Sequence, residues 1–178
     1  TLVTKNISDL KNFHGEQKDI IIKPLDGMGG SSIFRVKDRD SNASVIFETM
    51  TEQNERFCMA QKFLPEIKNG DKRILMVDGE PIPFSLARVP SQGETRGNLA
   101  AGGSGVIQEL TENDKRICEE IGEVLRERGL LFVGLDVIGN HLTEINVTSP
   151  TCLREIEKGT GLKIAEKVVK AAVQKIRP

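Results

Sequence analysis

Short apolar runs bounded by turn residues dominate the first half of the chain and predict β-strands. The clearest run, KDIIIKP, is typical of a buried strand that ends at Lys23 and a proline. The dipeptide Asp78-Gly79 between two later runs is a hairpin signal. The predicted elements of this half are strands at residues 18–24, 33–36, 57–64, 73–78 and 81–89, and a helix at residues 41–53.

Helical periodicity marks the second half. Apolar positions in residues 111–128 recur at helical spacing, Thr111 can cap this helix together with Asp114, and Gly129 ends it. Two further elements are predicted, a hairpin at residues 130–147 and a helix at residues 162–176. Hairpins interrupted by helices, without regular β-α-β alternation, indicate an α+β fold.

Residues 90–105 (PSQGETRGNLAAGGSG) break the pattern. The segment contains five glycines and few side chains that could anchor it in a core. A glycine-rich loop of this length inside a domain is usually functional or disordered.

Length and charge narrow the class of protein. A chain of 178 residues can build one sizeable core or two small subdomains that share a cleft. A net charge of −1 argues against a nucleic-acid or membrane surface, and no apolar run approaches the roughly 20 residues of a membrane helix. The three cysteines lack paired spacing, which favours a reducing cytoplasm. Because the chain starts at Thr1 and not at Met, we expect a domain boundary there.

The hairpin at residues 130–147 is a candidate metal site. Glu144 and Asn146 lie two residues apart and therefore share a strand face. If the turn is the three residues 139–141, Asp136 stands opposite Glu144 on that face; a two-residue turn slips the register and turns Asp136 away. Two carboxylates and an amide oxygen suit Mg²⁺ or Mn²⁺ and leave room for phosphate oxygens. The alternative is a solvated hairpin face with unrelated charges.

Lys23 and the glycine turn after it are a candidate phosphate site. A lysine at a strand end can meet a phosphate as a point charge. Gly27, Gly29 and Gly30 let backbone N–H groups approach an anion closely. Neither a Walker nor a Rossmann pattern is present, and an ordinary hairpin turn is the alternative.

Three arginines complete the candidate chemistry. Arg73 and Arg88 lie on the two strands of one hairpin, and Arg96 lies in the glycine-rich loop. Arginine forks suit carboxylates and phosphates, and phosphoryl transfer needs such cations beside a metal site and a lid. Solvated strand charges are the alternative. Cys152 has no histidine placed to activate it, so we expect a structural thiol.

Four runs together closely resemble the prokaryotic glutathione synthetase family: IIKPLDGMGGSSIFRV, GDKRILMVDGEPIPFSLARVP, GETRGNLAAGG and GLDVIGNHLTEINVTSPTC. The resemblance covers nearly the whole chain and implies an ATP-grasp fold, with two subdomains of mostly antiparallel sheets and flanking helices. Residues 1–65 would carry the phosphate flap and hinge, and residues 66–178 the metal site and the lid at residues 90–105. The family's N-terminal region would be missing, so that this chain alone binds ATP weakly and has little activity.

The resemblance also implies a reaction and assigns roles to residues. The family joins glycine to γ-glutamylcysteine with ATP, through an acyl phosphate, and we expect a cytoplasmic enzyme, homo-oligomeric at full length, that uses Mg²⁺, or alternatively Mn²⁺. Nucleotide binding would fall to Lys23, Gly27, Gly29 and Gly30 at the phosphates, to Gln61, Lys62, Phe63 and Leu64 at the adenine, and to Asp71 at the ribose. Catalysis would fall to Arg73, Arg88 and Arg96, metal binding to Asp136, Glu144 and Asn146, and substrate binding to Arg88, Thr148 and Ser149. The pair Lys62-Phe63 departs from the polar–aromatic pair usual in this hinge, which backbone contacts tolerate.

Two alternatives stay open. Another ATP-grasp carboxylate–amine ligase, such as a ribosomal-protein glutamate ligase or a D-alanine–D-alanine ligase, shares the metal and phosphate groups but is not expected to contain GETRGNLAAGG. A non-catalytic nucleotide-binding module is the other, and the retained arginines and metal-site residues count against it.

Overall fold

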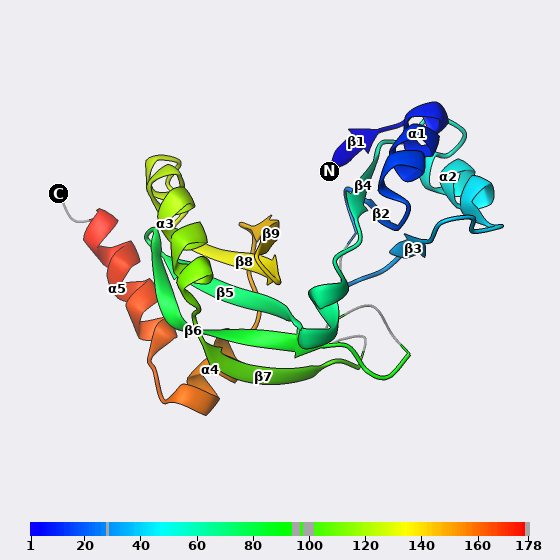
Figure 1. Cartoon of the computed structure of the whole chain (residues 1–178). Helices are drawn as coiled ribbons and strands as arrows, with labels where there is room; N and C mark the ends of the chain where they lie inside the picture. Colours follow the sequence, from blue (N-terminus) through cyan, green and yellow to red (C-terminus); the bar gives the residue numbers. More distant parts are fainter. Residues whose placement is uncertain (28, 94–96, 98–101, 177–178) are drawn as a thin grey trace. The chain divides into compact units, whose positions relative to one another are not determined.

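The computed structural model describes residues 1–27, 29–93, 97 and 102–176. Two units follow one another along the chain, Thr1–Pro65 and Glu66–Pro178. Each builds its own antiparallel sheet with its own helices, which confirms the α+β prediction (Figure 1).

The first unit is a four-stranded sheet with two helices. Its strands lie in the order β1-β4-β2-β3, and neighbours are antiparallel. Its elements are β1 (Leu2–Thr4), α1 (Ile7–Gln17), β2 (Ile20–Pro24), β3 (Phe34–Val36), α2 (Ala43–Thr51) and β4 (Cys58–Lys62). The elements predicted between residues 18 and 64 are confirmed, whereas β1 and α1 have no counterpart among the predictions.

The alternation of side chains along β2 separates the two faces of this sheet. Ile20 and Ile22 are fully buried in one cluster with Leu10 of α1 and Phe47 of α2. The helices therefore cover the face of the even-numbered residues of β2. Because successive side chains point to opposite faces, the odd-numbered residues, among them Lys23, point away from this core.

The second unit is built on a five-stranded antiparallel sheet in the order β7-β6-β5-β8-β9. Its elements are η1 (Pro65–Asn69), β5 (Asp71–Val77), β6 (Glu80–Val89), β7 (Ser104–Glu109), α3 (Glu112–Glu127), β8 (Phe132–Ile138), β9 (His141–Asn146), α4 (Leu153–Thr160) and α5 (Ile164–Ile176). The predicted hairpin turn joins β5 to β6, and Asp78 and Gly79 both have positive φ, at 52° and 77°, as a type I′ turn requires.

Both faces of this larger sheet are covered by helices. On one side Ile74 and Met76 of β5 pack with Ile117 and Leu125 of α3. On the other side Leu75 and its neighbours pack with residues of α4 and α5. Strands of a sheet that is covered on both faces have nearly continuous apolar sequences, which is why apolar and polar residues do not alternate cleanly along β5.

Three elements of this unit have no counterpart among the predictions: η1, β7 and α4. β7 begins at Ser104, inside the segment predicted as loop. This edge strand is largely exposed and has few apolar residues, so the apolar pattern does not predict it. Helix α4 follows Cys152, whose φ of 79° is left-handed and gives no ordinary helix-start signal. None of the helices in the described ranges is both long and apolar enough to cross a membrane.

The predicted capping box at the start of α3 is confirmed and extends into the core. Thr111 Oγ1 accepts from the backbone N–H of Asp114 at 3.2 Å, and Asp114 Oδ2 accepts from the backbone N–H of Thr111 at 3.0 Å. The other oxygen of Asp114, a fully buried residue, forms an ion pair with Lys72 of β5. Asp114 therefore caps a helix and neutralises a buried lysine of the sheet.

Replacing Asp114 by Ala should lower the free energy of unfolding by about 3–5 kcal/mol, because Lys72 is left buried without a partner and the cap is lost. Urea denaturation measures the loss. Glu112→Ala is the matched control: this exposed residue of the same turn pairs with exposed Lys115, and its loss should cost under about 1 kcal/mol. The double variant Lys72→Met, Asp114→Ala should recover part of the loss. Equal effects of the two single substitutions would contradict the buried-pair account.

Candidate functional site

β5, β6 and β8 place four charged side chains in adjoining rows. Arg73 stands directly opposite Asp136, and Asp71 stands directly opposite Arg88. Arg73 alternates with Leu75, so the group lies on the sheet face that α4 and α5 cover farther along. Arg73, Arg88 and Asp136 are 5, 4 and 4% exposed. Charges this deeply buried need partners, and these four alternate in sign.

The four side chains form one ion-pair network, which we call the Asp136 cluster (Asp71, Arg73, Arg88 and Asp136). Arg73 donates from Nε to Oδ1 of Asp136 at 2.5 Å and from Nη2 to Oδ2 at 3.0 Å. Nη2 of Arg88 lies 2.9 Å from the same Oδ2 and donates to Oδ2 of Asp71 at 2.5 Å. Nε of Arg88 donates to the backbone oxygen of Asp71 at 3.3 Å. The arginines are thus fixed in position before any substrate binds.

Asp71 is the least compensated member of the cluster. Burial raises the pKa of its carboxyl to about 6. The charges of Asp136 and Glu144 also raise this pKa, whereas those of Arg88 and Arg73 lower it. Its Oδ1 is buried and accepts no hydrogen bond from the residues that the structure describes. The pKa of Arg88 is raised: burial opposes its charge, but Asp71 and Asp136 outweigh burial.

The β8–β9 hairpin reaches the predicted pairing by an unpredicted route. Its turn has two residues, Gly139 and Asn140, so the supposed three-residue turn is wrong. An extra residue in β9, Thr143, then shifts the register by one, and Asp136 pairs with Glu144 after all. Sequence spacing alone does not reveal a bulge, so the length of the turn does not by itself determine the register of this hairpin.

The predicted metal residues lie together, but arginines already neutralise one of them. Nδ2 of Asn146 donates to Oδ2 of Asp136 at 3.4 Å, and Glu144 is exposed beside them. The sequence predicts that a metal ion balances the negative charge of Asp136. In the structure Arg73 and Arg88 balance it. Within the described ranges, no three side chains drawn from histidine, cysteine, aspartate and glutamate gather so as to hold a metal ion.

A strained turn after β9 contributes a residue that the sequence analysis missed. Ser149 and Cys152 both have positive φ, at 50° and 79°, which is uncommon outside glycine. Between them, Thr151 Oγ1 accepts from Nη1 of Arg73 at 3.3 Å. The only sequence signal was the nearness of this turn to the hairpin. Thr148 and Ser149 are exposed, and Cys152 is 5% exposed with a pKa raised by burial, which fits the predicted structural thiol.

In the first unit, Lys23, Gln61 and Phe63, three of the predicted nucleotide residues, lie on the sheet face that the helices leave open. Lys23 pairs across the strands with Met59, and Ile21 pairs with Gln61. Phe63 continues the same alternation beyond β4. Lys62 instead pairs with Ile20, on the helix-covered face. Of the residues predicted at the adenine, Lys62 therefore contributes its backbone and not its side chain to the open face.

The glycine turn after Lys23 is tightly packed at one point. A Cβ on Gly27 would lie 2.7 Å from the Pro24 ring, so a side chain there requires rearrangement. Gly29 and Gly30 have φ of 65° and 81°, where glycine is favoured. Met28 lies outside the described residues.

The predicted lid is described only in part, and Arg96 lies outside the described residues. Gly97 packs closely against the Asp136 cluster: a Cβ there would lie 2.3 Å from the backbone oxygen of Arg88 and 3.3 Å from Cβ of Asp71. A larger residue at position 97 would displace these strands. The segment quoted in the resemblance therefore touches the cluster at this glycine.

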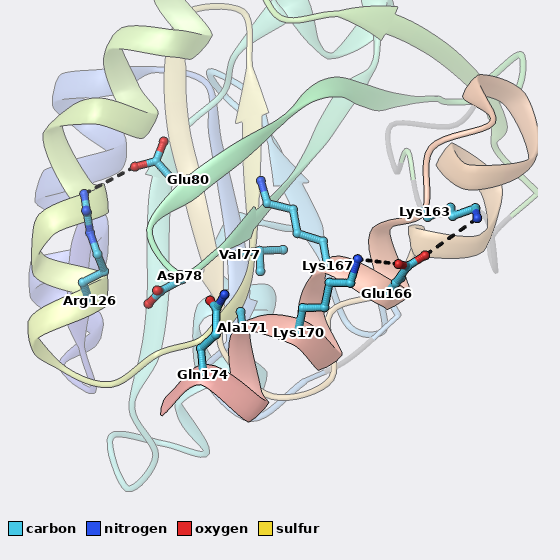
Figure 2. A pocket seen from close by; sticks show the side chains of 10 residues that line it. All are labelled: Val77, Asp78, Glu80, Arg126, Lys163, Glu166, Lys167, Lys170, Ala171 and Gln174. Atoms are coloured by element: carbon cyan, nitrogen blue, oxygen red, sulfur yellow. Dashed lines mark ion pairs between the residues drawn. The ribbon is translucent and has the colours of Figure 1, made fainter. Parts of the chain in front are cut away.

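A groove of about 630 Å³ lies away from these residues, between α5 and the β5–β6 turn (Figure 2). Several of its charged side chains pair with one another: Glu166 pairs with both Lys163 and Lys170, and Arg126 pairs with Glu80 (Figure 2). Because none of the predicted site residues that the structure describes lines it, the groove is left out of the proposed chemistry.

Comparison with known proteins identifies the family. The model of the prokaryotic glutathione synthetase ATP-grasp domain matches residues 1–161. The chain belongs to the prokaryotic glutathione synthetase family. Glutathione synthetase of Pseudomonas aeruginosa is 62% identical over 171 residues, covering 96% of this chain and 54% of the relative. The Escherichia coli K12 enzyme is 65% identical over 157 residues, covering 88% and 50%.

Solved structures confirm the ATP-grasp fold of this glutathione synthetase family member. The ATP-grasp ligase PsnB, complexed with minimal precursor, Mg and ADP, superposes with a TM-score of 0.68 at 17% identity, over 99% of this chain and 52% of that one. D-alanine–D-alanine ligase from Bacillus anthracis gives 0.59 at 16% identity, over 97% and 61%. The chain spans about half the length of the curated relatives it matches.

The raised pKa of Asp71 predicts a pH-dependent stability. The folded state holds this proton up to about pH 6, whereas an ordinary aspartate releases it near 3.8. Its contribution to stability is therefore present below 3.8 and lost as the pH rises through about 6. The free energy of unfolding of the wild type minus that of Asp71→Asn should fall by about 2.5 kcal/mol from about pH 4 to about pH 7. Urea titrations at several pH values test this; parallel profiles would contradict it. Asp38→Asn, at an exposed aspartate, is the control.

Proposed function

We propose that the protein containing this chain is an ATP-dependent carboxylate–amine ligase that makes glutathione from γ-glutamylcysteine and glycine. One observation carries the proposal most strongly. Arg73 and Arg88 are locked by Asp136 on the hairpin that also bears Glu144 and Asn146, in a chain of the prokaryotic glutathione synthetase family. Relatives from Pseudomonas aeruginosa and Vibrio cholerae, both named as glutathione synthetases, are 62% and 57% identical to this chain.

The proposed reaction has two steps. A cysteinyl carboxylate oxygen attacks the γ-phosphorus of ATP, and ADP leaves with the electrons of the broken bond. The glycine amine then attacks the acyl carbon, phosphate leaves, and the new amide nitrogen loses its proton. Negative charge collects on phosphoryl oxygens in the first step and on the acyl oxygen in the second, so both steps need fixed cations.

Arg73 and Arg88 are the proposed fixed cations. Their orientation is set by Asp136, so little reorganisation is needed as charge develops on the substrate. Nη1 of Arg88 is not used in the contacts with Asp71 and Asp136 and is the proposed donor to the acyl phosphate. Arg96 is proposed to join them from the lid, together with Thr148 and Ser149 at a substrate carboxylate.

Asp136, Glu144 and Asn146 fit a Mg²⁺ site in ligand type, with Mn²⁺ as an alternative. Oδ1 of Asp136 takes one hydrogen bond from Arg73, and a carboxylate oxygen has a second lone pair to offer. Asn146 donates through Nδ2, which leaves its carbonyl oxygen for a cation. Bound there, Mg²⁺ would neutralise phosphate oxygens.

The open face of the first unit is the proposed nucleotide platform. Lys23 and the backbone of Gly27, Gly29 and Gly30 would hold the phosphates, and residues 61–64 the adenine. Asp71 is the proposed ribose ligand, because its Oδ1 has accepting capacity that no described residue uses. A cytoplasmic homo-oligomer without nucleic-acid or membrane partners remains our expectation for the full-length enzyme.

The test is ADP formation by the full-length protein. We expect turnover only when ATP, γ-glutamylcysteine and glycine are all present, and a loss of about 100-fold or more in Glu144→Ala. Glu109→Gln, at an exposed glutamate of β7, is the control and should keep wild-type turnover. Unchanged turnover in Glu144→Ala would support a non-catalytic role for this hairpin. Turnover with D-alanine or a glutamyl acceptor in place of glycine would instead indicate a different ATP-grasp ligase.

A further inference from the structure

A stacked ion pair at one end of the open face holds the ring of Phe63. The guanidinium carbon of Arg35 lies 3.5 Å from the ring centre, close enough for the guanidinium to lie on the ring face. Asp19 grips the same guanidinium in two places, from Nε to Oδ1 at 3.0 Å and from Nη2 to Oδ2 at 2.6 Å. Arg35 therefore cannot leave the ring without breaking a two-pronged ion pair.

Asp19 also fixes the backbone of Phe63. Its carbonyl oxygen accepts the backbone N–H of Phe63 at 2.9 Å. The last ladder pair between β2 and β4 joins Ile20 to Lys62, so Phe63 lies just beyond the sheet. Its position is set through the ring by Arg35 and through the N–H by Asp19. Leu64, the next residue, precedes Pro65 and is thereby biased toward extended backbone.

We propose that Asp19 and Arg35 form a brace that presets the backbone of residues 61–64 for the nucleotide base, with Arg35 as a positioning residue. The inference rests on the proposed function, which puts the base against this segment. A segment already held in its binding conformation loses less conformational freedom when the ligand binds, so the brace raises nucleotide affinity. One ring face of Phe63 is covered by Arg35, and on that side the ring serves the brace and not the base.

A purely structural role for Arg35 predicts a different outcome. General loosening of the first unit would lower Tm and disturb turnover together with the KM of every substrate. The brace acts on the nucleotide segment alone. Its signature is a rise in the KM for ATP with kcat and the other two KM values unchanged, because uniform binding is lost and no interaction special to the transition state is removed.

The experiment uses the full-length protein that contains this chain. In Arg35→Met, the KM for ATP and the Kd of Mg-ATP measured by equilibrium dialysis should rise about tenfold, with kcat within about twofold of wild type. Arg35→Lys keeps a cation for the ring but loses the forked guanidinium, so its KM for ATP and its Kd should lie between those of the wild type and those of Arg35→Met. Phe63→Leu should raise the KM for ATP as much as Arg35→Met does. The double variant should bind ATP no more weakly than either single variant, because both substitutions remove the same contact between Arg35 and the Phe63 ring.

Lys18→Met is the matched control, since it removes an exposed ion pair of the same unit, with Asp38 at 4.0 Å; its ATP affinity should equal that of the wild type. Equal ATP affinity in Arg35→Met and wild type would overturn the brace, as would equal rises in all three KM values. A wild-type protein that binds ATP but makes no glutathione would overturn the proposed function alone, because the dialysis comparison still decides on the brace. A wild-type protein that binds no ATP would overturn both.

Discussion

The buried contact of Asp136 with Arg73 and Arg88 is the constraint on which the second unit depends. Four charged groups share a nearly dry stretch of sheet, and each needs an opposite neighbour. Strand register supplies most of these neighbours, because Arg73 stands opposite Asp136 and Asp71 stands opposite Arg88 on adjacent strands. Arg88 also reaches Asp136 across β5, which lies between their two strands. The cost of the arrangement appears at Asp71, whose pKa is raised to about 6 by burial. A site held this firmly can present two cations to a phosphoryl group without rearranging, which is what charge-stabilising catalysis requires.

Much of this could be predicted from the sequence, where the signal is local. The Asp78-Gly79 turn, the capping box of Thr111 and Asp114 and the strand of KDIIIKP all follow from the conformational preferences of a few adjacent residues. These elements are the frame of both units. Candidate site residues also emerged as types: carboxylates and an amide on one hairpin, and arginines on another.

What escaped prediction depends on contacts between distant residues. The bulge at Thr143 shifts the register after a two-residue turn, so that Asp136 pairs with Glu144. No residue near it in the sequence indicates this bulge. The arginines and carboxylates were assigned separately, to phosphate and to metal, although the structure joins them in one cluster. Thr151 reaches Arg73 only because a turn with two left-handed residues carries it there. Likewise, Arg35 and Phe63 are 28 residues apart by their numbers and meet only through the pairing of β2 with β3 and β4.

A crystal structure of the full-length protein with Mg²⁺ and a non-hydrolysable ATP analogue tests the central claim most directly. The account predicts the terminal phosphate within hydrogen-bond distance of Arg73 or Arg88, and a cation bound by Glu144 and Asn146 at about 2.1 Å. A triphosphate bound away from both arginines, with the Asp136 cluster unchanged and no cation at the hairpin, would contradict it.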